Sequence, residues 1–370
     1  MSESVPIKAE RVDVLDYARF VAAVAVMLFH YADLSIRFSH APFRIAIPGL
    51  TDFGKYGYLG VELFFMISGF VIFNSTKGRT ASQFATARAL RLYPAFIVCV
   101  LLTSAAVFYW GMPSYRIKPM QFFANLVMVP GVFGQTNIDG SYWSLAVEIK
   151  FYAVILLLML LGFAKKLNYF FLAWPVLLLL SSFLGFQWPQ FLKGYDSYFC
   201  AGAIFAIRRT KKSIILDTLL LVCLYFSLEL SAVKNLEVRD LHPLSPFIAT
   251  SFVVAFYVFF WALSNRLIDN VKLPFAKLVG GVTYPLYLIH QTVGYIIIRH
   301  FGNEQNKASV VLIVMIVMVM VGCFLHVYAE QKTENFWKAV FKKVVGMPVG
   351  WLEATFSNLQ LKVGGFIAPR

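Results

Sequence analysis

Four ionisable residues in strongly apolar surroundings are the first candidates for chemistry: His30, Glu62, Glu148 and His290. Near neutral pH an imidazole can take a proton from a hydroxyl, and a neighbouring carboxylate can orient the ring and stabilise the imidazolium. These residue types predict that His30, oriented by Glu62 or Glu148, acts as a general base. A buried polar network that serves only packing is the alternative interpretation, and for His290 a structural role is favoured.

Three arginines offer a second kind of chemistry. Arg88 and Arg91 are three residues apart, so on a helix they share a face and can place two guanidinium groups on phosphate oxygens. An ordinary basic loop would explain this pair alone. Arg19 adds a third cation, and on a helix it would share a face with His30 at a distance of about 16 Å. Arginines that could bind phosphates at one end of the site and a base, His30, at the other end suggest a ligand that extends between them.

The composition predicts the elements that must position these residues. Of the 370 residues, 59% are hydrophobic and only 14% are charged, whereas a soluble domain is about half apolar and about a quarter charged. A water-soluble globule is therefore excluded, and at about 20 apolar residues per crossing the chain has room for about ten transmembrane helices. We expect an all-α, polytopic integral membrane protein with spans at 12–31, 56–73, 92–110, 142–163, 169–186, 195–207, 214–230, 247–263, 279–298 and 309–328.

The distribution of lysine and arginine predicts the orientation. Ten spans put both termini on one side, and the loops on that side carry about twice as many Lys and Arg residues as the opposite loops. Both termini are therefore expected in the cytoplasm. Residues 1–330 form the expected transmembrane domain and residues 331–370 a basic cytoplasmic tail. An amphipathic helix on the membrane surface and a loosely ordered tail are both open for that segment.

With this orientation, the four residues considered first fall in the outer half of the membrane, Arg19 falls in its inner half, and Arg88 and Arg91 fall in the cytoplasmic connection between the second and third spans. Because ionisable groups are costly in lipid, we expect the four to face inward together.

The net charge of +14 would suggest a nucleic-acid partner in a soluble protein, but basic cytoplasmic loops explain it here, so we expect no nucleic-acid partner. The four cysteines stand in apolar runs without metal-ligand spacing, and we expect no metal site.

The chain resembles the acyltransferase family 3 integral-membrane enzymes from about Val14 to Tyr328. Each motif alone is weak, but five in the usual order are specific. They are LDYAR with LFHY (15–19 and 28–31), GVELFFMISGF (60–70), RALRLYP (88–94), YWSLAVEIKFY (142–152) and YPLYLIHQ (284–291). One departure concerns the fourth motif, in which the glutamate is usually followed by a second acidic or polar residue, whereas Ile149 follows Glu148 here.

The resemblance implies a ten-helix enzyme that takes an acyl group from cytoplasmic acyl-CoA and delivers it toward the outer face. It implies that His30 is catalytic, that Arg19 is its motif partner, and that Arg88 and Arg91 contact the phosphates of CoA. Glu62 and Glu148 match family positions, and orienting His30 is their expected role.

The candidate contacts for an acceptor are Trp143, Tyr287 and His290. For Trp143, an aromatic belt at the membrane interface is the favoured alternative.

The leading hypothesis is therefore an O-acetyltransferase of the inner (plasma) membrane. It would move an acetyl group from acetyl-CoA to a hydroxyl of a surface or exported glycan, or of a lipid-linked saccharide. A transporter or flippase whose charges line a substrate path is the rival, and a succinyl or other acyl donor is a variant of the same enzyme class. The acceptor, the acyl chain, the oligomeric state and the choice between base and covalent acyl carrier for His30 stay open.

Overall fold

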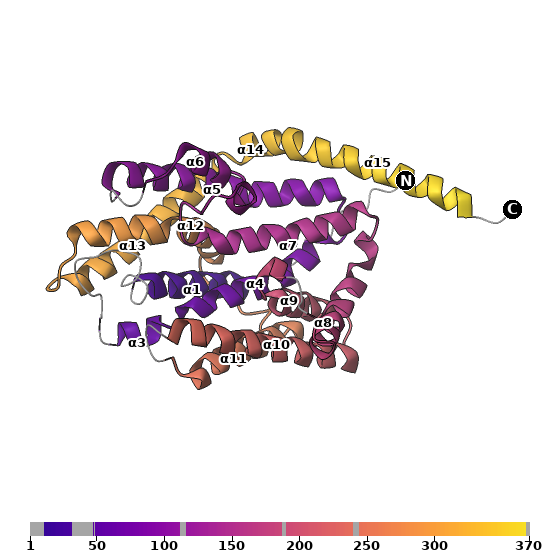
Figure 1. Ribbon diagram of the computed structural model, residues 1–370, viewed down its shortest axis with the longest axis horizontal. Helices are drawn as coiled ribbons and strands as arrows, with labels where there is room; N and C mark the ends of the chain where they lie inside the picture. The colour runs from indigo at the N-terminus through magenta and orange to yellow at the C-terminus, as the bar shows by residue number, and fades with distance from the viewer. Residues whose placement is uncertain are drawn as a thin grey trace.

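The computed structural model describes residues 11–31, 47, 49–111, 116–186, 190–239 and 244–367. Every regular element in these ranges is a helix, which confirms the all-α expectation. Figure 1 shows long helices running side by side, with α1 and α4 between α5 and α7 on one side and α10 and α11 on the other.

Each predicted span coincides with a helix. The bounds are α1 Asp13–Phe29, α4 Gly60–Thr76, α5 Ala81–Trp110, α7 Tyr142–Leu160, α8 Leu167–Phe183, α9 Asp196–Arg208, α10 Ile214–Arg239, α11 Pro246–Ser264, α12 Ala276–Phe301 and α13 Lys307–Leu325. Within the described ranges, seven helical segments are long and apolar enough to cross a membrane, and they contain α4, α5, α7, α8, α10, α11 and α13. The chain is therefore a polytopic membrane protein.

The other three predicted spans, α1, α9 and α12, differ from a simple membrane crossing in length or polarity. Helix α1 has 17 residues and α9 has 13, while α12 has 26 residues but carries the whole motif around His290. All three pack mainly against other helices: α1 against α12 and α4, and α9 against α4. Helices enclosed by protein can be shorter and more polar than helices that face lipid.

Two short helices lie in the connections that lead into α4 and α7. Helix α3 (Leu50–Gly54) precedes α4, and α6 (Pro119–Asn125) lies between α5 and α7. The connection after α6 contains Asp139, which lies three residues before α7 begins. This loop contributes to the candidate site.

Helix α5 begins eleven residues earlier than the span expected at 92–110. Thr80 caps its first turn, because its hydroxyl accepts a hydrogen bond from the backbone N–H of Gln83 at 3.2 Å and the Gln83 side chain accepts one from the N–H of Thr80 at 3.1 Å. This reciprocal cap starts the helix well before the apolar run. Arg88 and Arg91 therefore lie within a helix, whereas the sequence pattern placed them in a loop.

The segment after α13 is helical and docks on α5. It consists of a π-helical turn (His326–Gln331), α14 (Glu334–Phe341), a second π-helical turn (Lys342–Gly346) and α15 (Met347–Ile367). The Glu353 carboxylate accepts hydrogen bonds from the backbone N–H groups of Ala81 at 3.0 Å and Ser82 at 3.3 Å, which completes the cap of α5. In Figure 1, α15 runs along the bundle and projects beyond it. A position on the membrane surface stays a prediction.

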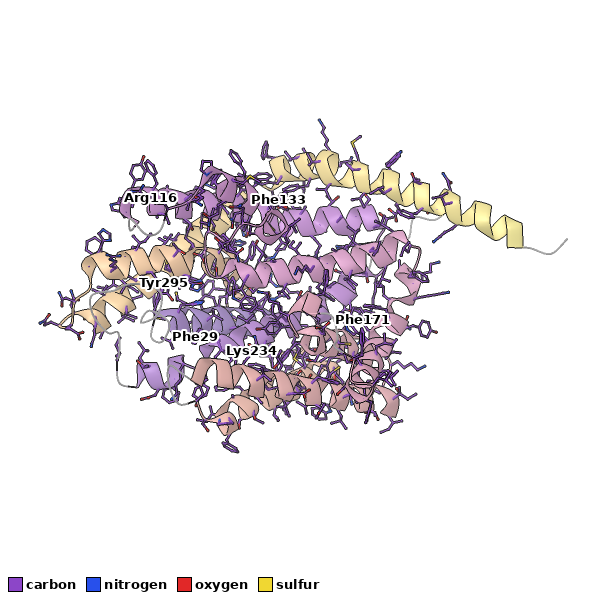
Figure 2. All side chains as sticks on the ribbon, viewed as in Figure 1. Phe29, Arg116, Phe133, Phe171, Lys234 and Tyr295 are labelled. Carbon is purple, nitrogen blue, oxygen red and sulfur yellow. The ribbon has the colours of Figure 1, made fainter. Side chains whose placement is uncertain are left out.

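Side chains fill the spaces between the helices (Figure 2). Helices α4 and α9 pack closely, because two glycines let their backbones approach each other. A Cβ atom at Gly69 would lie 2.0 Å from the Phe199 carbonyl oxygen, and one at Gly202 would lie 2.0 Å from the Met66 carbonyl oxygen. Small residues at a helix–helix contact allow the backbones of membrane helices to approach closely. This contact fixes α4, which carries one wall of the candidate site.

Replacing Gly202 by alanine tests this contact. A single methyl group must push α9 away from α4, and overpacking of this kind costs about 1–3 kcal/mol. We expect Gly202→Ala to lower the thermal unfolding midpoint of the detergent-solubilised protein. Gly131→Ala is the matched control, since a Cβ atom there meets nothing within 4 Å. Equal midpoints for the two variants would contradict the close packing.

Candidate active site

The candidate site begins where α1 ends, at a pair of buried histidines. His30 Nδ1 lies 2.8 Å from His290 Nε2, which joins the end of α1 to the middle of α12. Both rings are buried, with exposed fractions of 7% and 0%. The expectation that Glu62 or Glu148 orients His30 is therefore wrong, because the partner of the ring is a second imidazole.

The protonation pattern of this pair follows from the backbone. His290 Nδ1 lies 2.8 Å from the Tyr287 carbonyl oxygen, which can only accept a hydrogen bond, so His290 Nδ1 carries the proton. Neutral His290 then has a lone pair on Nε2, and His30 Nδ1 must donate to it. In neutral His30 the remaining nitrogen, Nε2, carries a lone pair. The backbone carbonyl thus leaves His30 in the form that a base or nucleophile needs.

Two tyrosines fix the backbone around the pair. The Tyr31 hydroxyl donates to the His290 carbonyl oxygen at 2.5 Å, and the Tyr295 hydroxyl donates to the His30 carbonyl oxygen at 3.0 Å. Each helix therefore supplies a tyrosine that holds the histidine backbone of the other. In Figure 2, Phe29 and Tyr295 lie toward the same end of the bundle, away from Phe171.

Asp139 secures the same region from the loop before α7. Its carboxylate is fully buried and accepts hydrogen bonds from the Ser141 hydroxyl at 2.6 Å and from the Thr292 backbone N–H at 2.9 Å. The contact with Thr292 lies two residues beyond His290. This aspartate ties the start of α7 to the helix that carries the histidine.

A cavity of about 270 Å³, here called the central cavity, lies between α1, α4, α5, α7 and α12. The guanidinium groups of Arg19, Arg88 and Arg91 line one end of it. The structure thus brings the three arginines to one cavity. Arg88 Nε is buried and has no hydrogen-bond partner in the described part of the chain, whereas Arg91 lies 3.9 Å from a Glu330 carboxylate oxygen and Arg19 lies 3.4 Å from Asp16.

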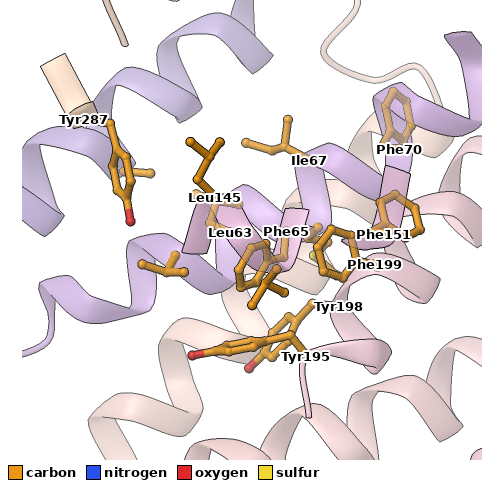
Figure 3. Close-up of a cluster of buried hydrophobic side chains, with 14 of the residues drawn as sticks. Leu63, Phe65, Ile67, Phe70, Leu145, Phe151, Tyr195, Tyr198, Phe199 and Tyr287 are labelled. Carbon is orange, nitrogen blue, oxygen red and sulfur yellow. The ribbon is translucent and has the colours of Figure 1, made fainter. Parts of the chain in front are cut away.

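The opposite end of the central cavity stops one residue layer short of the histidines. Its lining there includes Phe64, Ser144 and Tyr287, and the Tyr287 and Ser144 hydroxyls lie 2.6 Å apart. The Tyr287 ring is 5.6 Å from the His290 ring, centroid to centroid. The close-up in Figure 3 shows Tyr287 on the opposite side of Leu145 from Phe65. Tyr287 therefore lines the cavity and also contacts His290.

Glu148 lines the central cavity, where its carboxylate accepts hydrogen bonds from the Ser68 hydroxyl at 2.8 Å and from the Tyr152 hydroxyl. The Tyr152 ring also lies under Arg88, with 5.9 Å between the guanidinium carbon and the ring centroid. Glu148 therefore belongs to the network around the arginines.

Glu62 belongs to a third group, on the side of α4 that faces α10. Its Oε1 atom lies 3.8 Å from Lys234 Nζ. The expected inward layer of four ionisable residues thus divides into three clusters: the histidine pair, the Glu148 network and the Glu62 ion pair. Trp143 lies in this last region, where its ring stacks on Tyr195 at 5.7 Å.

Sequence reasoning missed several residues that the structure brings to these clusters. Tyr152 stands four residues after Glu148, a helical spacing that would have indicated the contact. Asp139 lies in a loop and Lys234 near the end of a helix, and nothing in their local sequence separates them from ordinary surface charges.

Comparison with known proteins gives a family and distant relatives. The profile of the acyltransferase 3 family, described as an acyltransferase domain, matches residues 12–328. Nodulation protein 10 of Rhizobium leguminosarum bv. viciae is 27% identical over 119 residues, which is 27% of this chain and 32% of that protein. An O-acetyl transferase of Shigella phage Sf6 is 27% identical over 153 residues, which is 38% of this chain and 43% of that protein. No solved structure matches significantly.

The two alignments cover less than half of each relative, so they do not carry over a whole activity. The family profile, in contrast, spans every motif from the arginine of α1 to the histidine of α12. The chain therefore belongs to acyltransferase family 3.

Proposed function

We propose that the protein is a membrane O-acetyltransferase that moves an acetyl group from cytoplasmic acetyl-CoA to a hydroxyl of a surface or exported glycan. The observation that carries the proposal is the hydrogen-bonded chain that leaves His30 Nε2 with a lone pair, next to a cavity whose far end holds three guanidinium groups. The names of the relatives support acyl transfer to oxygen.

The arginine end of the central cavity fits the phosphates of an acyl-CoA. A buried guanidinium nitrogen without a partner is costly, and Arg88 Nε would gain a charge-assisted hydrogen bond from a phosphate oxygen. Phosphate would also compete with Glu330 for Arg91, since that ion pair is long at 3.9 Å. The cavity volume of about 270 Å³ suits the acyl and pantetheine end, and the nucleotide would remain at the mouth.

In the transfer one proton moves, and the carbon–sulfur bond of the thioester is replaced by the carbon–oxygen bond of an ester. His30 Nε2 takes the proton of the acceptor hydroxyl as the hydroxyl oxygen attacks the thioester carbon. The carbon–sulfur bond breaks, the ester bond remains, and the CoA thiolate takes the proton back from His30. If His30 Nε2 attacks first, the CoA thiolate leaves and His30 carries the acetyl group; the acceptor hydroxyl then displaces the imidazole, and its proton passes to the thiolate. His290 stabilises the charged ring in either case.

The acetyl group must pass Tyr287 to reach His30. Within the described residues the Tyr287 hydroxyl contacts Ser144 at 2.6 Å and the Ser141 carbonyl oxygen at 3.4 Å, so rotation of one side chain would open the cavity to the histidines. Glu148 would act in donor binding, through Tyr152 and the arginines.

This function requires a defined topology. Residues 1–330 would form ten transmembrane helices in the inner (plasma) membrane, with α1, α9 and α12 completing the set. Both termini would be cytoplasmic, which puts the arginines inside and the histidine pair outside. Residues 331–370 would be the cytoplasmic tail.

The His30→Ala variant tests the proposed reaction. Removing the base should reduce acetyl transfer from radiolabelled acetyl-CoA to glycan in purified membranes by about 10²–10⁴-fold. His300→Ala is the control, because His300 is an exposed histidine of the same bundle. Full activity of His30→Ala would remove His30 from the mechanism. Glycan movement without release of CoA would favour the transporter alternative.

The role of His290 is tested by His290→Phe, which keeps an aromatic ring but removes the acceptor nitrogen. His30 then loses the partner that orients it, so kcat should fall at least tenfold while the KM for acetyl-CoA changes less than twofold. Steady-state kinetics in nanodiscs separate the two constants. An unchanged kcat would show that the histidine pair serves packing alone.

Donor binding is tested at Arg88. Replacing the guanidinium by an uncharged amide in Arg88→Gln removes charge-assisted hydrogen bonds of about 1.5–3 kcal/mol each, so the KM for acetyl-CoA should rise about 10- to 150-fold. Arg79→Gln is the matched control, since Arg79 is exposed in the turn before α5. Equal KM values for the two variants would contradict a phosphate site at Arg88.

A further inference from the structure

A second and larger cavity, here called the side cavity, lies between α7, α8, α9 and α10. Its volume is about 820 Å³. It is separate from the central cavity, and its lining combines aromatic rings, hydroxyls and charges of both signs, including Trp143, Ser182, Tyr195, Glu229 and Lys234.

The wall of the side cavity has a partly exposed aromatic ring, Trp143, with the buried Tyr195 ring behind it and polar groups beside it. The Trp143 and Tyr195 rings are stacked with an interplanar angle of 29° and 5.7 Å between their centroids. Lys234 Nζ lies 3.7 Å from the Tyr195 centroid and Lys193 Nζ lies 5.1 Å from the Trp143 centroid. Such a surface suits a sugar, because a sugar ring presents C–H groups to an aromatic face and hydroxyls to charged groups around it.

The Glu62 ion pair joins the side cavity to the protein interior. Both Glu62 carboxylate oxygens are buried and have no hydrogen-bond partner in the described ranges, and Lys234 is 3.8 Å away. The buried Glu62 carboxylate can hold the Lys234 ammonium by electrostatic attraction. Its oxygens can also accept a hydrogen bond from another group. Glu62 therefore keeps the Lys234 ammonium beside the aromatic wall.

Only one layer of side chains separates the two cavities. Phe65 lines the central cavity, and its ring lies 4.6 Å from Tyr195 and 6.4 Å from Trp143, both of which line the side cavity. Figure 3 shows Phe65 beside Tyr195. On α7, Trp143 lines the side cavity and the next residue, Ser144, contacts Tyr287. The side cavity and the histidine pair thus flank the same end of the central cavity.

We infer that the side cavity binds the saccharide unit of the acceptor. The partly exposed Trp143 ring packs against the sugar with the buried Tyr195 ring behind it, while Lys234 and Glu229 bind its hydroxyls. Bound there, the saccharide lies against the wall of the central cavity at the end away from the arginines. The inference rests on the proposed function, since it assigns the acceptor to one place in the fold.

A variant that fills the side cavity tests the inference without disturbing the core. Ser182→Trp places a bulky ring in the cavity from the exposed end of α8. The probe is envelope polysaccharide of the source cells, stripped of its O-acyl esters by mild base, and its binding to protein in nanodiscs is measured directly. We expect Ser182→Trp to weaken this binding at least tenfold and to leave the binding of labelled acetyl-CoA within twofold. Leu184→Trp is the control, because Leu184 is 79% exposed near the same helix end and does not line the cavity.

Trp143 supplies a second test of the same inference. Trp143→Ala should weaken polysaccharide binding as Ser182→Trp does, and Trp143→Phe should restore most of it. Wild-type protein that does not bind the polysaccharide, or Ser182→Trp that binds it like the wild type, would overturn the inference. Protein that binds the polysaccharide in a Ser182-dependent manner but consumes no acetyl-CoA would contradict the proposed function and leave the saccharide site standing.

Discussion

The hydrogen bond from His290 Nδ1 to the Tyr287 carbonyl oxygen is the constraint on which the account of this site depends. Because a carbonyl only accepts, this bond fixes the proton positions on both imidazoles and leaves the lone pair on His30 Nε2. Its effect reaches His30 through the 2.8 Å contact between His30 Nδ1 and His290 Nε2, which needs α1 and α12 in close register, and the reciprocal bonds of Tyr31 and Tyr295 supply that register. Gly294 permits it, since a Cβ atom there would lie 2.0 Å from the Tyr31 hydroxyl.

Much of the fold could be predicted from the sequence, because lipid imposes a simple rule on composition. Runs of apolar residues correctly located each of the ten predicted helices along the chain. The boundaries were less accurate where polar capping extends a helix. The capping box at Thr80 and Gln83 moved the start of α5 by eleven residues and turned a predicted loop into the helix that carries Arg88.

The residues of the site could be predicted, but not how they group. Helical spacing gives depth and face within one helix, yet it does not say which neighbouring helix a face meets. For this reason His30 was paired with a carboxylate, whereas α12 brings His290 to it and α10 brings Lys234 to Glu62. Residues such as Asp139 act through tertiary contacts that leave no local pattern in the sequence.

The most direct measurement of the central claim is the tautomeric state of the histidine pair. Nitrogen-15 NMR of histidine-labelled protein, assigned by comparison with His30→Ala and His290→Phe, reports which ring nitrogen carries the proton. We expect neutral His30 and neutral His290 both to be protonated at Nδ1 and unprotonated at Nε2. A spectrum with the proton of His30 on Nε2 would contradict it, because the ring would then have no free electron pair to offer a substrate.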